Sequence, residues 1–127
     1  MPTKPLVSIV DDDEAVRLAL RSLVRSLGYV SNVFASAEEF LESSHLNETS
    51  CLISDVQMPG MNGIELQNRL KILDRGTPVI FVTAFPDERT RARAFEAGAI
   101  GFLEKPFEGR VMIQLIELAL RARRERA

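Results

Sequence analysis

Short apolar runs alternate along the chain with longer segments in which apolar residues recur at helical spacing. The runs at 6–10, 29–35, 51–54, 78–83 and 100–104 predict five strands. Helices are predicted at 16–27, 36–43, 64–73 and 87–97, with a last one from 107 onwards. Ser36 and Glu39 have the spacing of a capping box, and Asp87 is the expected cap of the fourth helix. The chain therefore reads as five consecutive pairs of a strand and a helix.

This strict alternation predicts an α/β fold, a doubly wound five-stranded parallel sheet with helices on both faces. Right-handed crossovers between parallel strands leave few other arrangements. The runs at 6–10, 51–54 and 78–83 are almost entirely apolar, which is typical of strands covered on both faces. We take the strand order 2-1-3-4-5 from known folds of this type, because the residues themselves do not specify it.

The composition is that of one ordinary globular domain. Of the 127 residues, 46% are hydrophobic and 27% are charged, and this length suffices for a single core. We expect the domain over 1–120 and a basic tail or linker stub over 121–127, where four arginines accompany one glutamate. The tail is short and has no aromatic residue, so no direct contact with nucleic acid is expected.

Two further features concern the compartment. The single cysteine, Cys51, has no partner for an internal disulfide, which favours a reducing environment. No apolar run reaches the roughly 18 residues that a membrane helix needs, and the first residues lack the apolar core of a signal peptide. We therefore expect a cytoplasmic protein without a membrane segment.

The informative polar side chains fall at the ends of the predicted strands. Asp11 and Asp12 follow the first strand, Asp55 follows the third, Thr83 ends the fourth and Lys105 follows the fifth. In open parallel sheets, ligands bind beyond the carboxyl ends of the strands, at the point where strand order reverses. For the order 2-1-3-4-5 this point lies between the first and third strands, which carry the three aspartates. We therefore expect these side chains to share one site.

Three neighbouring carboxylates need a counter-charge. Each pair repels by roughly 4 kcal/mol at about 4 Å and an effective dielectric constant of about 20. A divalent cation offsets this repulsion, and a few oxygen ligands suit Mg²⁺, or else Mn²⁺. Such a cation and Lys105 would attract phosphate oxygens, and Thr83 offers a hydrogen bond. Asp55 stands alone after its strand, so it is the best candidate for a nucleophile that accepts a phosphoryl group.

Simpler readings of the same residues remain open at this point. The run Asp11–Glu14 also suits the start of a helix, and this is the expected role of Asp13 and Glu14. Asp55 could cap the turn that follows it, and Lys105 could be a solvated turn residue. Two glycines of that turn are expected to need positive φ, Gly60 and Gly63.

Four short motifs occur in order, each beside its own predicted strand. They are "IVDDDE" (9–14), "SDVQMPGMNG" (54–63), "VTA" (82–84) and "EKPF" (104–107). With them the chain resembles the receiver domains of two-component response regulators over essentially its whole length. The blocks "ASAEEFL" (35–41) and "GAIGFLEKPF" (98–107) are further similar to the FixJ-like subfamily. Members of that subfamily usually join the receiver to a DNA-binding helix-turn-helix.

The resemblance implies a role for each residue of the site. Asp55 would accept a phosphoryl group from a histidine-phosphorylated sensor kinase. Mg²⁺ would be held by Asp12, by Asp55, by the backbone carbonyl of Gln57 and, largely through water, by Asp11. Lys105 would pair with the phosphoryl oxygens and, in the resting state, with Asp55.

Two residues would pass the phosphorylation signal to the surface. Thr83 would move to hydrogen-bond the phosphoryl group, and Phe102 would swing inward to fill the space left. Many relatives have tyrosine or histidine at the latter position. Phe102 has no hydroxyl group and can make no such contact in either state. It could also be a plain core residue. The bond from Lys105 to Pro106 would be cis, at a modest cost for an X-Pro bond.

The resulting hypothesis is a signalling switch that controls a partner or an output domain, most simply in transcription regulation, and not a turnover enzyme. A phosphorylation-dependent homodimer would use the surface of 87–97, 100–104 and the last helix. One rival is an aspartate-based phosphatase, which normally has a second acid two residues after its nucleophile, where this chain has Gln57. The other rival is an interaction module that does not need phosphorylation.

Overall fold

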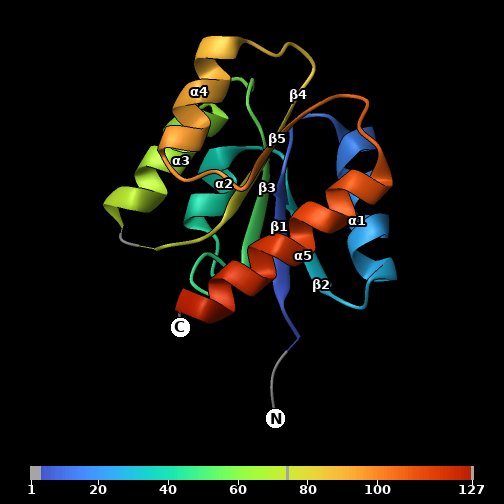
Figure 1. The fold of residues 1–127 in the computed structure, drawn as a ribbon. Helices are drawn as coiled ribbons and strands as arrows, with labels where there is room; N and C mark the ends of the chain where they lie inside the picture. Colours follow the sequence, from blue (N-terminus) through green and yellow to red (C-terminus); the bar gives the residue numbers. More distant parts are fainter. Residues whose placement is uncertain (1–3, 74, 127) are drawn as a thin grey trace.

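The computed structural model describes residues 4–73 and 75–126, the side chains of 124–126 excepted. Within these residues strands and helices alternate throughout, as Figure 1 shows. The elements are β1 (Leu6–Val10), α1 (Glu14–Ser26), β2 (Val30–Phe34), α2 (Ala37–Glu42), β3 (Cys51–Asp55), α3 (Gly63–Ile72), β4 (Val79–Thr83), α4 (Glu88–Glu96), β5 (Gly101–Glu104) and α5 (Gly109–Arg126).

The strands form one parallel sheet in the order β2-β1-β3-β4-β5. This arrangement confirms the predicted fold class and strand order. β1 and β3 are direct neighbours, and Val10 lies beside Ser54 in their register. The residues that follow these two strands therefore emerge side by side at the carboxyl edge of the sheet.

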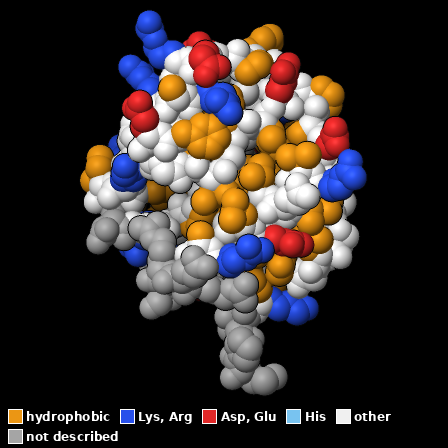
Figure 2. Space-filling view, viewed as in Figure 1, with side chains coloured by type: hydrophobic (Ala, Val, Ile, Leu, Met, Phe, Trp, Pro, Cys, Tyr) orange, Lys and Arg blue, Asp and Glu red, His pale blue; other side chains and the backbone are white. Residues whose placement is uncertain are grey.

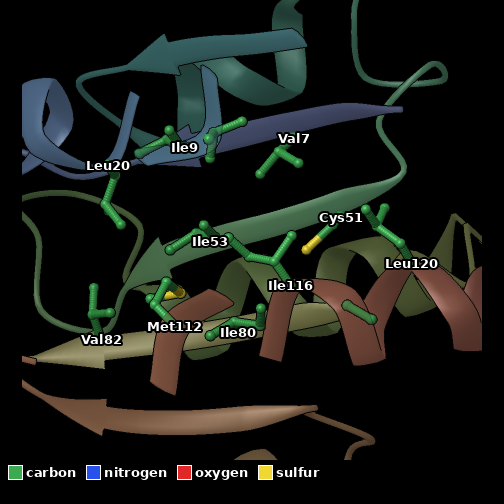
Figure 3. Packing of buried hydrophobic residues seen from close by; sticks show 12 residues of the cluster. Val7, Ile9, Leu20, Cys51, Ile53, Ile80, Val82, Met112, Ile116 and Leu120 are labelled. Carbon is green, nitrogen blue, oxygen red and sulfur yellow. The ribbon is translucent and has the colours of Figure 1, made fainter. Parts of the chain in front are cut away.

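Two apolar clusters, one on each face of the sheet, hold the helices in place. On one face, α1 and α5 supply side chains such as Leu20 and Ile116, which pack with Ile53 of β3 (Figure 3). On the other face, α2, α3 and α4 surround a cluster that contains Phe40 and Phe81. Because successive strand residues point to opposite faces, both faces of a central strand must be apolar. This explains why these runs of the sequence are almost entirely apolar.

Two predicted helix caps are present in the structure. The side chain of Asp87 accepts a hydrogen bond from the backbone N–H of Arg89 at the start of α4. At the start of α2, the Ser36 hydroxyl accepts the N–H of Glu39 at 3.1 Å. The return bond from the Glu39 side chain is not formed among the described residues, so only half of that capping box exists.

A complete capping box lies instead at the start of α3. The side chain of Asn62 accepts the N–H of Glu65 at 2.8 Å, and the Glu65 carboxylate accepts the N–H of Asn62 at 2.9 Å. This box fixes the point at which the loop after β3 becomes a helix.

Residues 121–126 belong to the last helix, whereas Ala127 of the predicted tail lies outside the described residues. Helix α5 runs through Arg126 without a break at residue 120, where the predicted domain ends and the predicted tail begins. The Lys105–Pro106 peptide bond is cis, as expected. In the described part of the chain, every helix is too short or too polar to cross a bilayer.

Candidate functional site

The predicted site residues meet at the carboxyl edge of the sheet. Asp11 follows the last residue of β1, and Asp55 is the last residue of the neighbouring strand β3. Thr83 ends β4, and Lys105 follows β5, with its backbone N–H bonded to the carbonyl of Thr83 at 2.8 Å. Four separate strands thus bring these side chains to one place.

Three carboxylates form the acidic part of the site. Asp11, Asp12 and Asp55 each place a ligand oxygen within 4.8 Å of the others. Asp11 is fully buried and Asp55 is 4% exposed, whereas Asp12 faces solvent. A set of carboxylate oxygens that opens to water on one side fits a hard divalent cation such as Mg²⁺, which keeps several waters when bound. The residues present therefore fit the expected cofactor.

Lys105 supplies the positive charge of the site. Its Nζ lies 2.9 Å from Asp11 Oδ2 and 3.3 Å from Asp55 Oδ2, and the side chain is only 17% exposed. Burial acts to lower the pKa of Lys105, but its contacts with the two carboxylates outweigh burial and raise that pKa above its ordinary value. Lys105 is therefore a structural part of the acidic cluster and not a solvated turn residue.

Asp55 is held in an unfavourable environment for a charge. Burial of the side chain, reinforced by the charge of Asp11, raises the pKa of Asp55 from its ordinary 3.8 to about 6, although Lys105 opposes this shift. Asp55 Oδ1 also accepts the N–H of Gln57 at 3.2 Å. It therefore caps the following turn, as the simpler reading proposed, while its Oδ2 faces Lys105.

Within the acidic run at 11–14, Asp13 and Glu14 start helix α1 as predicted, whereas metal binding by Asp11 and Asp12 stays a prediction. Asp11 Oδ1 accepts the N–H of Asp13 at 2.8 Å, which shapes the loop between β1 and α1. Asp13 is the N-cap of α1, and its carboxylate accepts the N–H of Ala15, while Glu14 lies in the first helical turn. The carbonyl of Asp11 accepts a hydrogen bond from Arg17 Nη1 at 2.7 Å, a contact that the sequence did not reveal.

The two residues predicted to switch lie in neighbouring strands, Thr83 at the end of β4 and Phe102 within β5. The Thr83 hydroxyl is buried and accepts the N–H of Phe85 at 3.1 Å. Phe102 is partly buried, and its ring centroid lies 6.2 Å from that of Phe81 in the core. The side chain of Gln57, whose carbonyl was predicted as a metal ligand, is exposed. Movement of Thr83 and Phe102 stays a prediction.

Two glycines near Asp55 have different reasons to be glycine. Gly60 has a φ of 76°, as predicted. Gly63 does not have positive φ, so that part of the prediction was wrong. Its requirement is space, because a Cβ there would overlap the carbonyl oxygen of Asp55. Gly63, the first residue of α3, therefore packs directly against the backbone of Asp55.

Comparisons with known proteins agree with this geometry. The family model of the response regulator receiver domain matches residues 7–117. Nodulation protein W of Bradyrhizobium diazoefficiens is 38% identical over 124 residues, which cover 98% of this chain and 55% of that protein. The transcriptional regulatory protein FixJ of the same organism is 38% identical over 121 residues, which cover 95% of this chain and 59% of FixJ.

A solved structure shows the same likeness in three dimensions. The response regulator StyR has 46% sequence identity and a TM-score of 0.90, over 98% of this chain and 63% of that chain. The chain spans about half the length of the curated relatives it matches. Because the family model covers most of the sequence and its motifs meet in one site, the chain belongs to the response regulator receiver domains and is FixJ-like within them.

Proposed function

We propose that this receiver domain is a signalling switch in which Asp55 accepts the phosphoryl group. Receiver domains of response regulators take that group from sensor histidine kinases. The observation that carries the proposal is the ammonium group of Lys105, which lies 3.3 Å from Asp55 Oδ2 and 2.9 Å from Asp11 Oδ2. A cation held against the acceptor carboxylate can offset the charge that an incoming phosphoryl group adds.

The transfer needs mainly positioning and charge from the protein. A carboxylate oxygen of Asp55 forms the new bond to phosphorus, the bond from phosphorus to the kinase imidazole nitrogen breaks, and that nitrogen takes a proton from solvent. The N–H of Gln57 fixes Asp55 Oδ1, and Lys105 lies beside Oδ2. Mg²⁺ held by Asp11, Asp12, Asp55 and the carbonyl of Gln57 would supply further positive charge for the phosphoryl oxygens.

Thr83 and Phe102 would carry the change away from the site. In the phosphorylated state the Thr83 hydroxyl would donate its hydrogen to a phosphoryl oxygen instead of only accepting the N–H of Phe85. Phe102 is partly buried at rest, so its inward movement would tighten an existing contact with Phe81 and not create a new one. The expected change at the surface is therefore modest and favours a partner that reads a shifted population.

The proposal separates a switch from a dedicated enzyme. A phosphatase built on an aspartate nucleophile would turn over small substrates, whereas a switch keeps its phosphoryl group long enough for a partner to read it. An inert interaction module would take up none. Asp55 is followed by Val56 and Gln57 and not by a second acid, which favours the switch.

Incubation with acetyl phosphate and Mg²⁺ is expected to add one phosphoryl group to the chain, as measured by intact mass. Asp55→Asn should take up none, because an amide cannot form an acyl phosphate, and Asp13→Asn should behave like the parent, since asparagine also caps helices. Rapid release of phosphate without an adduct would support the phosphatase. Neither an adduct nor phosphate release would support the inert module.

The wider role follows from the relatives and stays part of the proposal. FixJ is a transcriptional regulatory protein, and this chain covers 59% of its length. We therefore propose that phosphorylation of Asp55 controls a transcriptional output domain or a separate partner, in the cytoplasm. The kinase recognises the domain, whereas contact with DNA belongs to the output part.

We propose that the face formed by α4, β5 and α5 is a dimer surface. Figure 2 shows apolar side chains exposed on this side of the molecule, and Phe95 and Leu118 are 39% and 46% exposed. Arginines of α4 border the patch, and Arg91 lies over the ring of Phe95 at 5.0 Å. These cations could pair with Glu117 of a second copy across a two-fold axis. We propose that phosphorylation promotes this dimer.

Beryllofluoride, a phosphoryl mimic, is expected to shift the sedimentation of the protein from monomer to dimer at a protein concentration of about 100 μM. The concentration matters because the dimer fraction rises with it by mass action. Leu118→Glu should keep the protein monomeric, because it places a charge in the apolar patch. Ile72→Glu alters a residue of α3 that is 78% exposed and lies outside this surface, so it should still dimerise. Monomeric sedimentation of the parent with beryllofluoride would reject the dimer.

A further inference from the structure

The loop of residues 56–62 carries the carbonyl of Gln57 and has few polar ties to the rest of the molecule. Backbone hydrogen bonds fix its ends, from Val56 N to Val82 O and from Gly63 N to Val56 O. Between these ends, residues 58–61 make one hydrogen bond to another element in the described part of the chain. It runs from the backbone N–H of Met61 to Oε2 of Glu38 in α2, over 3.1 Å.

Gly60 lets the Glu38 carboxylate lie directly against the loop. Its φ of 76° is in the left-handed region, where a side chain is disfavoured. A Cβ at this position would also lie 2.6 Å from Glu38 Oε2. The conformation of the loop and the absence of a side chain at Gly60 therefore both fit the place that Glu38 occupies.

We propose that Glu38 is a positioning residue for the metal site, which holds the loop in the shape that presents the carbonyl of Gln57. This inference rests on the proposed function, in which that carbonyl is a ligand of Mg²⁺. The first turn of α2 contains Glu38, so its charge also suits the helix dipole and adds to the negative field around a cation. A neutral hydrogen-bond acceptor at position 38 keeps the bond to Met61 but removes the carboxylate charge, so it separates the two contributions.

Glu38→Ala is expected to weaken Mg²⁺ binding about tenfold, the lower end of what losing an outer support of a metal ligand costs. Glu38→Gln also removes the charge, but its amide oxygen can still accept the N–H of Met61. Its affinity should therefore stay within about twofold of the parent. Glu39→Ala removes a neighbouring exposed acid without touching the loop and should bind like the parent. Isothermal titration calorimetry with MgCl₂ measures all four affinities.

Equal weakening in both Glu38 variants would assign the effect to charge and overturn the proposal. An alanine variant that binds Mg²⁺ like the parent would overturn it too. Thermal unfolding followed by circular dichroism shows whether each variant stays folded, and the glutamine variant keeps the test valid if alanine lowers stability. A parent that binds no Mg²⁺ would reject the metal part of the proposed function as well, whereas an unaffected Glu38→Ala rejects this inference alone.

Discussion

Removal of divalent cations is expected to slow phosphoryl uptake at Asp55 by at least about 100-fold, which corresponds to only about 2.7 kcal/mol of barrier. Asp11, Asp12 and Asp55 gather three carboxylates with ligand oxygens within 4.8 Å, and Lys105 offsets one of their charges. The phosphoryl donor is itself an anion, so each uncompensated carboxylate opposes its approach by roughly 1 to 4 kcal/mol at about 4 Å, depending on solvent access. We therefore expect the cation to decide whether the donor can reach the acceptor.

Time courses of intact mass with acetyl phosphate, in Mg²⁺ and in EDTA, measure this rate. Mn²⁺ should restore uptake after chelation, because it accepts the same oxygen ligands. Na⁺ at the same ionic strength should not, which separates a bound divalent cation from general screening. Equal rates in Mg²⁺ and EDTA would contradict the role given to the three acids.

Two neighbouring acids provide a matched comparison within the same prediction. Asp12→Asn removes the negative charge of one carboxylate of the cluster. Half-maximal phosphoryl uptake should therefore need a higher Mg²⁺ concentration. Asp13→Asn removes the same charge one residue away, but asparagine can still cap α1. If both variants shifted the Mg²⁺ requirement equally, the effect would come from overall charge and not from the ligand set.

The position of the site could be predicted from the sequence because parallel strands all point the same way. Asp11, Asp55 and Lys105 each stand at the end of an apolar run, and in a parallel sheet those ends lie at one edge. Placing these three side chains at one edge required no knowledge of how elements far apart in the sequence pack together. The adjacency of β1 and β3 was different, since it came from known folds and not from the residues of this chain.

The contacts that tune the site could not be predicted, because they join elements that are far apart in the sequence. Glu38 looks like an ordinary acid in the first turn of a short helix, and its bond to Met61 depends on how α2 packs beside the loop. The turn pattern predicts a positive φ for Gly63, whereas its real constraint is a close approach to the carbonyl of Asp55. Local patterns contain propensities but not such distances.

Asp55→Asn is expected to make the metal-free protein more stable at pH 7, by on the order of 2 to 3 kcal/mol. In the folded protein, burial and then the charge of Asp11 raise the pKa of Asp55 to about 6, compared with 3.8 ordinarily. At pH 7 the native state therefore holds an ionised carboxylate in a place that disfavours it. Asparagine has nearly the same shape without the charge, and Lys105 keeps its ion pair with Asp11.

The pH dependence of this gain in stability shows whether the ionised form of Asp55 causes it. Below the unfolded pKa of 3.8, Asp55 is protonated in both states and contributes nothing. As the pH rises towards 6, the unfolded chain has released its proton while the folded protein retains it, so the stability of the parent falls through this window and stays lower above it. The difference between variant and parent should therefore be small near pH 4 and fully developed at pH 7. Urea unfolding in EDTA at both pH values measures it.

Asp87→Asn serves as the control with the opposite sign. Hydrogen bonds from Thr90 and from the backbone of Arg89 lower the pKa of Asp87, so its ionised form stabilises the fold and its loss should not raise stability at pH 7. Adding Mg²⁺ should narrow the gap between the parent and Asp55→Asn, because the cation stabilises only a folded protein whose acceptor carboxylate can bind it. A variant at position 55 that is no more stable than the parent in EDTA, or equally stabilised at pH 4, would show that the ionised acid is not disfavoured. Such a result would remove the electrostatic reason for a cation at this site.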